Sequence, residues 1–289
     1  MKEIVKEKIA SLLSGDEEIQ SVEQLGGMTN QNYLVQTSSN QYIVKFFGKG
    51  TDKLIDRQNE KFNLELLKDL ELDVENYLFD IEAGIKVNQY IENAETLNLD
   101  TIKTRFEKIA PILQTIHASG KELKGEFAPF EEIKKYESLI QGEIYYPNYE
   151  AVRKSVFSLK EELEQIGIEK KSCHIDLVPE NFIEGPDGHL YLIDWEYSSM
   201  NDPMWDLAAL FLESEFTTEE EEDFLAHYES EKTPVSREKI RIYKILQDII
   251  WSLWTIYKEE NGADFGDYGI SRYNRAVKEL DFKGGSHEN

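Results

Sequence analysis

The sequence predicts an α+β fold of two lobes, a small lobe with a five-stranded antiparallel sheet and a larger, mainly helical lobe. Two observations support this prediction. Short runs in which apolar and polar residues alternate, a pattern typical of strands, fill most of the chain up to Ile91. Beyond Glu95 the apolar residues recur at helical spacing instead. We therefore expect one domain at residues 1–91, a second at 92–289, and a cleft between them.

The predicted sheet lobe begins with a helix and is then divided by turns. In residues 2–13 the apolar side chains recur at helical spacing, which predicts a short covering helix. Gly26-Gly27 and Ser38-Ser39-Asn40 separate the first three strand-like runs, so both junctions predict antiparallel hairpins. A helix is expected at 52–70, and strands are expected at 19–25, 31–37, 42–47, 77–79 and 85–91.

The second lobe is predicted to consist of helices. In the stretch 102–117, Pro111 has no N–H to donate, so we expect a kink or a break near Ala110. The last residues, 281–289, have little to bury and are expected to be frayed. Further helices are predicted at about 130–141, 149–166, 203–214, 219–229, 237–259 and 269–280.

The charge of the chain limits the kind of partner. Of its 289 residues, 32 are Lys or Arg and 57 are Asp or Glu, which gives a formal net charge of −25. Nucleic acid and anionic membranes attract basic patches, so neither is an expected partner. A negative field favours encounter with a small cation, although solubility explains the charge more simply. No protein partner is evident.

Cysteine usage and hydropathy predict the compartment. Cys173 is the single cysteine, which excludes an internal disulfide and fits a reducing compartment. The first thirteen residues are amphipathic and charged, without the apolar core of a signal peptide. No run approaches the ~20 apolar residues of a membrane span. We expect a cytoplasmic protein.

A group of polar residues in the second lobe indicates phosphoryl transfer. His174, Asp176 and Asn181 form H-x-D-x-x-x-x-N, and a strand-like run then leads to Asp194. Metal-assisted phosphoryl transfer needs a carboxylate that accepts a hydroxyl proton, and an amide and a second carboxylate that hold Mg²⁺. We therefore predict Asp176 as the base, with Asn181 and Asp194 as the metal ligands. The alternative is a surface loop with an incidental aspartate.

The histidines are predicted to be structural. His174 stands two residues before the predicted base, so we expect it to brace the loop through hydrogen bonds. His117 has the apolar helical neighbours Leu113 and Ile116, which favours a packing role. The five histidines and one cysteine show no spacing typical of a zinc site.

Lys45 lies in a predicted strand where it alternates with apolar residues. A buried ammonium group needs anionic partners, and nucleotide phosphates would supply them. We expect a helix glutamate to orient this lysine, with Glu60 as the first candidate and Glu65 as the second. The alternative is a lysine on an edge strand that faces solvent.

The loop from Gly26 to Asn32 is a candidate phosphate cradle. Glycine lets backbone N–H groups approach phosphate closely, and Thr29 and Asn30 add side-chain donors beside Gly27. An ordinary glycine-containing hairpin turn is an equally good interpretation, because the loop lacks the G-x-G-x-x-G pattern.

Three aromatic residues point to the acceptor. Trp251, Trp254 and Tyr257 recur along one face of a predicted helix. Such a stripe usually packs in a core. Aromatic faces also attract quaternary ammonium, which has no N–H to donate, and an acid nearby would strengthen such a site. The residues that could face this helix are Glu196, Tyr197 and Glu213.

These residues lie in blocks that resemble the choline kinase and aminoglycoside phosphotransferase superfamily, which has a protein-kinase-like fold. The resemblance extends over nearly the whole chain and, within the superfamily, is closest to the bacterial choline kinases. WEYSS, the spacing from DLA to Glu213 and the W-x-x-W pair favour that subgroup. The blocks are LGGMTNQNY, YIVKFF, CHIDLVPENF, LIDWEYSSMNDPMWDLAALFLE and IIWSLWTIYKEE.

The resemblance implies ATP- and Mg²⁺-dependent phosphorylation of choline to phosphocholine, which in bacteria feeds the decoration of surface polymers. One alternative is a kinase for ethanolamine, another small amino alcohol or an aminoglycoside. Another is a kinase-like binding module without catalysis. Such a module would usually lack one of the key residues, and all are present: Lys45, Asp176, Asn181 and Asp194.

The resemblance also assigns roles. Asp176 matches the catalytic base, and Asn181 and Asp194 match the metal ligands. Lys45 and Glu60 match the pair that positions the nucleotide phosphates. The hinge that holds adenine matches Asn88, Gln89, Tyr90 and Ile91, and the choline pocket matches Trp251, Trp254, Glu213 and, additionally, Tyr197.

One part of the implied pocket has no clear match. Eukaryotic relatives place a further aromatic residue shortly after Glu213, where this chain has Thr217 and Thr218. Phe216 is the residue that could substitute, so choline and less methylated amines both remain candidate acceptors.

Overall fold

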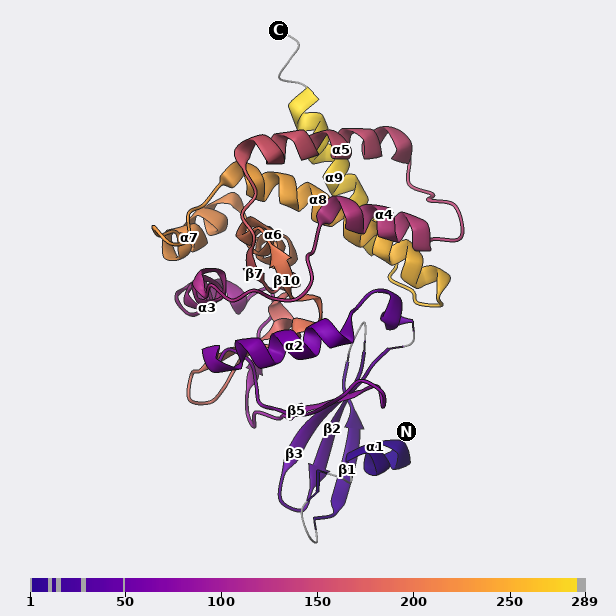
Figure 1. Ribbon diagram of the computed structural model, residues 1–289, viewed down its shortest axis with the longest axis vertical. Helices are drawn as coiled ribbons and strands as arrows, with labels where there is room; N and C mark the ends of the chain where they lie inside the picture. The colour runs from indigo at the N-terminus through magenta and orange to yellow at the C-terminus, as the bar shows by residue number, and fades with distance from the viewer. Residues whose placement is uncertain (1, 10–11, 14–16, 27–29, 49, 285–289) are drawn as a thin grey trace. The chain divides into compact units, whose positions relative to one another are not determined.

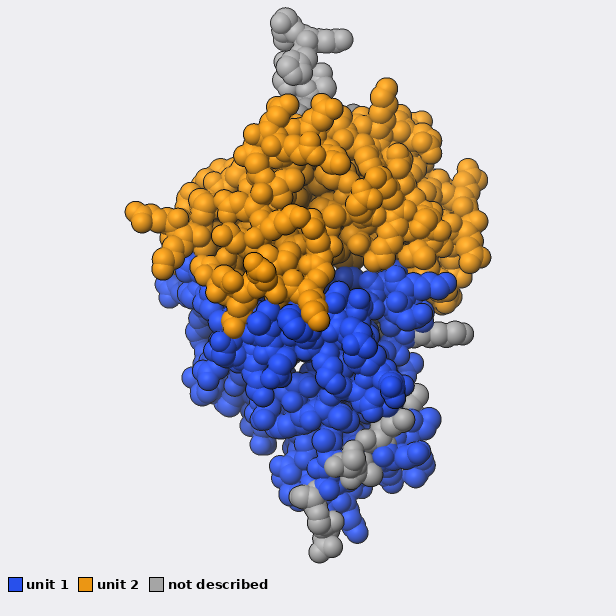
Figure 2. All heavy atoms as spheres, in the orientation of Figure 1, with its two compact units in different colours: residues 1–115, 179–198 blue, residues 116–178, 199–289 orange. Residues whose placement is uncertain are grey.

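The computed structural model describes residues 2–9, 12–13, 17–26, 30–48 and 50–284 (Figure 1). The chain forms two compact units, coloured separately in Figure 2: unit 1 has residues 1–115 and 179–198, and unit 2 has residues 116–178 and 199–289. This division differs from the expected boundary after Ile91, because unit 1 extends to residue 115 and the chain returns to it at residue 179. The division of function at Ile91, with nucleotide binding before it and catalysis after it, stays a prediction.

The predicted five-stranded antiparallel sheet is confirmed in unit 1. Its strand order is β1-β2-β3-β5-β4, and each neighbouring pair is antiparallel. Together with the helices described below, this sheet confirms the α+β fold. The strands are β1 (Ile19–Gln24), β2 (Gln31–Thr37), β3 (Gln41–Phe46), β4 (Asn76–Asp80) and β5 (Ile85–Gln89).

The sheet has an apolar face and a face that carries lysines. Val35 and Val44 belong to a buried cluster that also contains side chains of α1 (Lys2–Ile9). Successive residues of a strand point to opposite faces, so Lys45 lies on the other side of the sheet from Val44. The register of β3 and β5 places Lys45 directly opposite Lys86. Two adjacent buried lysines require carboxylates on that face.

Helix α2 (Arg57–Leu67) supplies part of this negative charge. The Asp56 carboxylate caps the helix by accepting from the N–H groups of Gln58 and Asn59. The buried face of α2 is mostly polar, whereas its apolar Phe62 is 39% exposed. The stretch predicted as one helix at 52–70 is divided in three, since the 3₁₀ turns η1 (Thr51–Lys53) and η2 (Lys68–Leu70) flank α2.

A three-stranded antiparallel sheet, also in unit 1, carries two of the predicted site residues. Its order is β6-β8-β9, from β6 (Glu95–Thr96), β8 (Phe182–Glu184) and β9 (Leu190–Leu192). The 3₁₀ turn η4 (Pro179–Asn181) precedes the β8–β9 hairpin, and η5 (Trp195–Tyr197) follows it. Asn181 and Asp194 therefore lie at the two ends of one hairpin.

Unit 2 is built around helix α8 (Arg237–Glu260), which packs against α4, α5, α6 and α9 (Figure 1). The described helices confirm the predicted ones, although α9 continues to Gly284 through residues expected to be frayed. In unit 1, η3 (Ile102–Thr104) is followed by α3 (Phe106–Ala118), whose last three residues belong to unit 2. Pro111 lies inside α3 and does not end that helix. The other elements are α4 (Pro129–Leu139), α5 (Tyr149–Ile166), β7 (Lys171–Cys173), β10 (Ser199–Asn201), α6 (Pro203–Glu213), α7 (Thr218–Tyr228) and α9 (Tyr268–Gly284).

None of the helices in the described part of the chain combines the length and the apolarity that crossing a membrane requires.

Candidate active site

In unit 1, Lys45 is paired with a carboxylate. Its Nζ lies 2.7 Å from Oδ1 of Asp194, and the residue is only 7% exposed. Burial alone would lower the pKa of Lys45, but the carboxylates of Asp194 and Glu196 outweigh it, so the pKa is raised. Lys45 is therefore a buried, charged lysine and not a solvent-facing edge residue.

The two predicted metal ligands lie next to each other in unit 1. The N–H of Ile193 donates to the carbonyl of Asn181 over 2.9 Å, which joins the two ends of the β8–β9 hairpin. Asp194 has φ 68° and ψ 56°, a left-handed conformation that is uncommon for a residue other than glycine. Carboxylate and amide oxygens are the donors that Mg²⁺ prefers, so this pair fits the metal.

Glu60 is not the partner of Lys45 that the sequence suggested. Its two carboxylate oxygens bind Arg57 Nη1 at 2.6 Å and Lys86 Nζ at 3.2 Å. The reason is the register of the sheet, which places a second buried lysine beside Lys45. Glu60 acts on Lys45 only at longer range, as the smallest of the charges that raise its pKa. Glu65, the other candidate, is exposed.

Glu196 belongs to a buried network in unit 1 and is not free for an acceptor pocket. Its Oε2 accepts from Asn30 Nδ2 at 2.7 Å and from Arg57 Nη1 at 2.9 Å. Asn30 in turn accepts from Arg57 at 3.0 Å and from the N–H of Gly48 at 3.3 Å. Burial, and after it Asp194, raises the pKa of Glu196. The Asn30 amide thus holds the network together, whereas the sequence had suggested that it faces phosphate.

The remaining nucleotide-side predictions are placed as follows. Gly27 and Thr29 lie outside the described residues. Asn88 and Gln89 end β5, where the Asn88 side chain accepts from Asn76 at 2.8 Å and the Gln89 N–H donates to the Glu75 carbonyl at 2.8 Å. Tyr90 and Ile91 directly follow that strand.

In unit 2, the backbone that leads to Asp176 is held by a buried carboxylate. Asp206 on α6 accepts from the N–H of His174 and from the N–H of Ile175, both over 2.8 Å. Ile175 has φ 79°, which is strained for a β-branched residue. The indole N–H of Trp205 donates to the Ile175 carbonyl at 3.1 Å. These bonds hold Asp176 in a loop of fixed conformation.

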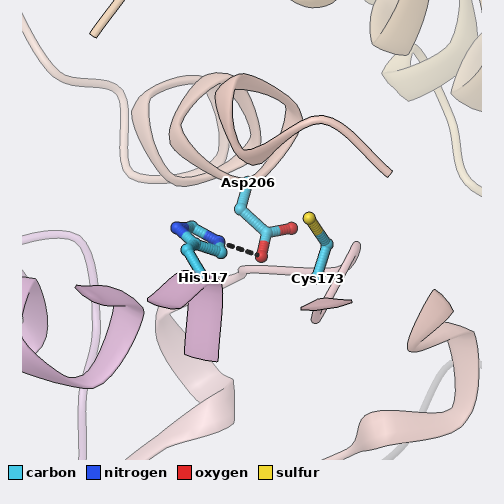
Figure 3. Close-up of side chains that lie close together, drawn as sticks. All are labelled: His117, Cys173 and Asp206. Carbon is cyan, nitrogen blue, oxygen red and sulfur yellow. Dashed lines mark hydrogen bonds and ion pairs between the residues drawn. The ribbon is translucent and has the colours of Figure 1, made fainter. Parts of the chain in front are cut away.

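His117 extends this arrangement (Figure 3). Its Nε2 lies 3.0 Å from Oδ2 of Asp206, and its Nδ1 lies 2.7 Å from the hydroxyl of Tyr228. The predicted packing histidine therefore makes two buried polar contacts. Cys173 lies beside this pair, and the three potential ligand atoms are within 4.8 Å of one another. Both imidazole nitrogens are already in hydrogen bonds, and burial raises the pKa of the thiol, so this set suits a hydrogen-bond network better than a metal.

Glu213, at the end of α6, is part of an ion-pair group with α8 and α9. Arg272 Nη2 lies 2.6 Å from Glu213, and Arg272 Nε lies 3.2 Å from Asp248. Arg275 binds Asp248 through two contacts of 2.6 Å. Burial raises the pKa of Tyr268, and Glu213 and Asp176 raise it further. Glu213 and the predicted base are therefore both electrostatic neighbours of Tyr268.

The aromatic stripe on α8 is buried. Trp251, Trp254 and Tyr257 are 8%, 5% and 5% exposed, and the two tryptophan rings meet edge to face at 6.5 Å. Phe265 packs on Trp254 at 4.9 Å, and the Lys258 ammonium lies 5.7 Å from the Trp254 ring. Among the described residues, the Trp254 indole N–H has no acceptor. A buried indole donor without a partner is uncommon in a pure core position.

Two further aromatic candidates lie elsewhere. Tyr197 belongs to unit 1 and is 9% exposed. Phe216 packs in a core cluster with Phe211 and Phe224, at 5.7 Å and 6.4 Å between ring centres. Phe216 is thus occupied by packing within unit 2.

Sequence reasoning missed the residues that support the predicted ones: Arg57, Asp206 and Arg272. Asp206 and Arg272 act on partners that are remote in sequence, so no local spacing identifies them. Arg57 pairs with Glu60 three positions away, but its second partner Glu196 is also remote. The D-P at Asp202-Pro203 marks the start of α6 and was the nearest available signal for Asp206, which lies one turn further on.

A family model, two solved structures and a curated relative each show similarity to this chain. The family model described as choline/ethanolamine kinase matches residues 22–277. A crystal structure of choline kinase LicA from Streptococcus pneumoniae is 75% identical, covers 98% of this chain and 99% of that one, and superposes with a TM-score of 0.95. A structure of LicA in complex with AMP is 76% identical, with 97% and 98% covered and a TM-score of 0.92. Protein LicA from Haemophilus influenzae is 31% identical over 89% of this chain and 79% of its own length.

Proposed function

Because the chain belongs to the choline/ethanolamine kinase family, we propose that it transfers the γ-phosphate of ATP to the hydroxyl of choline, giving phosphocholine and ADP. The observation that carries this proposal is the 75% identity to the choline kinase LicA, over nearly the full length of both chains. The AMP complex of LicA supports an adenine nucleotide as the donor. We further propose that the product serves the decoration of bacterial surface polymers.

Asp176 is the proposed catalytic base. It accepts the proton of the acceptor hydroxyl as the oxygen attacks phosphorus, while the bond from phosphorus to the leaving oxygen of ADP breaks. A base must be within hydrogen-bond reach of that hydroxyl, so its position matters as much as its pKa. Asp206 supports this role because it accepts both backbone N–H groups that precede Asp176.

Lys45, Asn181 and Asp194 are proposed to receive the phosphates. The oxygen donors of Asn181 and Asp194 would hold Mg²⁺, which neutralises charge on the phosphoryl oxygens when it is bound. Lys45 adds a buried positive charge that needs no reorganisation during transfer. Glu60 pairs with Arg57 and with Lys86, the neighbour of Lys45 in the sheet. The proposed adenine contacts are the backbone groups of residues 88–91, with Gly27 and Thr29 near the phosphates.

The acceptor is proposed to bind beside Trp251 and Trp254. Glu213 gives charge to that region, but Arg272 pairs with it at 2.6 Å and offsets much of that charge. A primary ammonium needs hydrogen-bond acceptors, whereas a trimethylammonium group is held by aromatic faces. This favours choline over ethanolamine. Tyr197 is a further proposed contact.

An ADP-release assay with choline, ethanolamine and kanamycin in parallel tests the proposal. We expect the highest kcat/KM for choline and loss of nearly all turnover in Asp176→Asn, with circular dichroism unchanged. A higher kcat/KM for ethanolamine would replace the acceptor in this proposal. Wild-type kcat in Asp176→Asn would show that another group is the base.

A further inference from the structure

We propose that a cavity in unit 2, whose lining includes none of the phosphate-side residues of unit 1, binds a small anion that carries a phosphate group. We call it the α6–α8 cavity, since the N-termini of those two helices border it. It is lined by His117, Tyr228, Asp202, Lys171, Lys232 and Lys239, together with apolar side chains. None of these residues has a role in the proposed phosphoryl transfer.

The charge around the cavity favours an anion. Asp202 is 0% exposed and is neutralised by Lys239, whose Nζ lies 2.7 Å from it. Among the described residues, Lys171 and Lys232 form no ion pair, and Glu169 is the one other acid in the lining. In a chain with a net charge of −25, a cavity with more lysines than acids is a local exception. An anion here would be attracted against the field of the rest of the chain.

The helix that begins at the cavity adds to this preference. α8 has 24 residues, and its cap Ser236 lines the cavity. The partial positive charge at a helix N-terminus favours a bound anion. The lysines and the N-terminus of α8 therefore both attract an anion into the cavity, and both contribute to its affinity.

The size of the cavity limits the ligand. Its volume is about 170 Å³, below the roughly 300–1,000 Å³ of pockets that hold cofactors and drug-sized ligands. This excludes a nucleotide and fits inorganic phosphate or the phosphate ester of a small alcohol. The apolar part of the lining, with Ile166, Met204 and Val235, favours an ester with a small organic group.

The lining connects to the loop of the proposed base. Tyr228 and His117 are bonded to each other at 2.7 Å, and His117 contacts Asp206 at 3.0 Å. Asp206 accepts the N–H groups of His174 and Ile175 at 2.8 Å each. A ligand that moves Tyr228 therefore changes the donors around Asp206, and through them the position of Asp176. This consequence, a change in kcat, rests on the proposed function; binding itself does not.

Binding is tested by NMR without nucleotide or acceptor. Inorganic phosphate and phosphocholine are titrated separately into the ¹⁵N-labelled chain, and the amides of Thr233 and Ser236 are followed. The test variant is Lys171→Gln with Lys232→Gln. The control is Lys134→Gln with Lys160→Gln, which removes the same charge from exposed lysines elsewhere in unit 2. We expect the test variant to weaken binding at these amides by about ten-fold, or about 1.4 kcal/mol, and the control by less than about two-fold.

The outcomes separate the possibilities. Phosphocholine binding more tightly than phosphate supports an ester, and the reverse order supports inorganic phosphate as the ligand of the same site. No shift at Thr233 and Ser236, or equal weakening in both variants, overturns the site. In the ADP-release assay, phosphocholine bound at the cavity should change kcat in the wild type and not in Lys171→Gln/Lys232→Gln, whereas competition at the acceptor pocket raises the KM for choline in both. An unchanged kcat overturns the coupling between the cavity and Asp176. A wild-type protein that phosphorylates no acceptor overturns the proposed function, and the NMR titration then still decides whether the cavity binds the anion.

Discussion

Replacing Glu60 with glutamine removes the charge that joins two buried cations in unit 1. The Glu60 side chain is 0% exposed, and its partners Arg57 and Lys86 are 7% and 1% exposed. Glutamine keeps the size of the side chain and one carbonyl acceptor. The substitution therefore tests the charge of Glu60 with little change in packing.

The loss of stability in Glu60→Gln depends on the partners that Arg57 and Lys86 retain. Arg57 retains Glu196 at 2.9 Å and Asn30 at 3.0 Å, so it stays paired. Lys86 loses its paired carboxylate and keeps the electrostatic attraction of Asp73 and the Phe79 ring, at 5.5 Å from its Nζ. Leaving one buried charge unpaired costs about 3–5 kcal/mol, and the remaining partners of Arg57 place this variant near 3 kcal/mol. At about 2–4 °C per kcal/mol, Tm should fall by about 6–12 °C.

Differential scanning fluorimetry and urea unfolding measure this loss. Glu65→Gln is the matched control, because Glu65 lies on the same helix and is exposed. Its free energy of unfolding should change by less than about 0.5 kcal/mol. If Glu60→Gln and Glu65→Gln shifted Tm equally, the buried ion pairs would not stabilise unit 1 in the way argued.

Three further predictions concern pH, packing and substrate. Burial raises the pKa of Asp73 from 3.8 to about 6, so the folded state binds its proton more tightly and loses stability as pH rises through that range. Because Asp73 is only partly buried, urea unfolding should show Asp73→Asn gaining about 1–2 kcal/mol on wild type between pH 4 and pH 7; no gain would contradict the shift. In Gly269→Ala, the new Cβ would lie 2.9 Å from Thr255 Cβ and Cγ2, so the free energy of unfolding should fall by about 1–3 kcal/mol, despite the better helix propensity of alanine; a higher Tm would refute the close approach of α9 to α8. Trp254→Ala should raise the KM for choline far more than the KM for ATP in the ADP-release assay, and equal increases would indicate a core role for the ring.

The sequence predicts best where local pattern decides the structure. The strands of the five-stranded sheet follow from period-two alternation, and Ser38-Ser39-Asn40 marks a real hairpin. Asn181 and Asp194 were expected together from their motif, and the β8–β9 hairpin does join their backbones. Short-range rules are sufficient in these cases, because the partners are neighbours in sequence or in one hairpin.

Prediction fails where burial is decided by remote partners. The apolar positions of 52–70 predicted a helix, and the helix that forms buries mainly the polar side chains Arg57, Glu60 and Asn63. Arg57 and Glu60 are buried because Glu196 and Lys86, far away in sequence, provide opposite charges. Asn63 is buried with its amide donating to the Ser198 carbonyl. The kinase template paired Glu60 with Lys45, and nothing in the local pattern indicates that Lys86 takes that place.

The acceptor side shows the same limit. Glu213 was predicted as the acid of the choline pocket, and no local pattern indicated that Arg272 on α9 pairs with it across 59 positions of sequence. Arg272 stands in a helix whose pattern predicts only an amphipathic surface. Its burial, at 4% exposed, results from the packing of α9 on α8.

Cys173 can be used as a natural probe of local unfolding. It is the single cysteine, it is 0% exposed in β7, and burial keeps its thiol protonated and unreactive. A thiol-reactive dye added to the native protein will therefore label it only when the structure around β7 opens. The labelling rate gives the opening free energy of that part of unit 2 directly, without an engineered probe, and comparison with global unfolding shows whether the two units melt together.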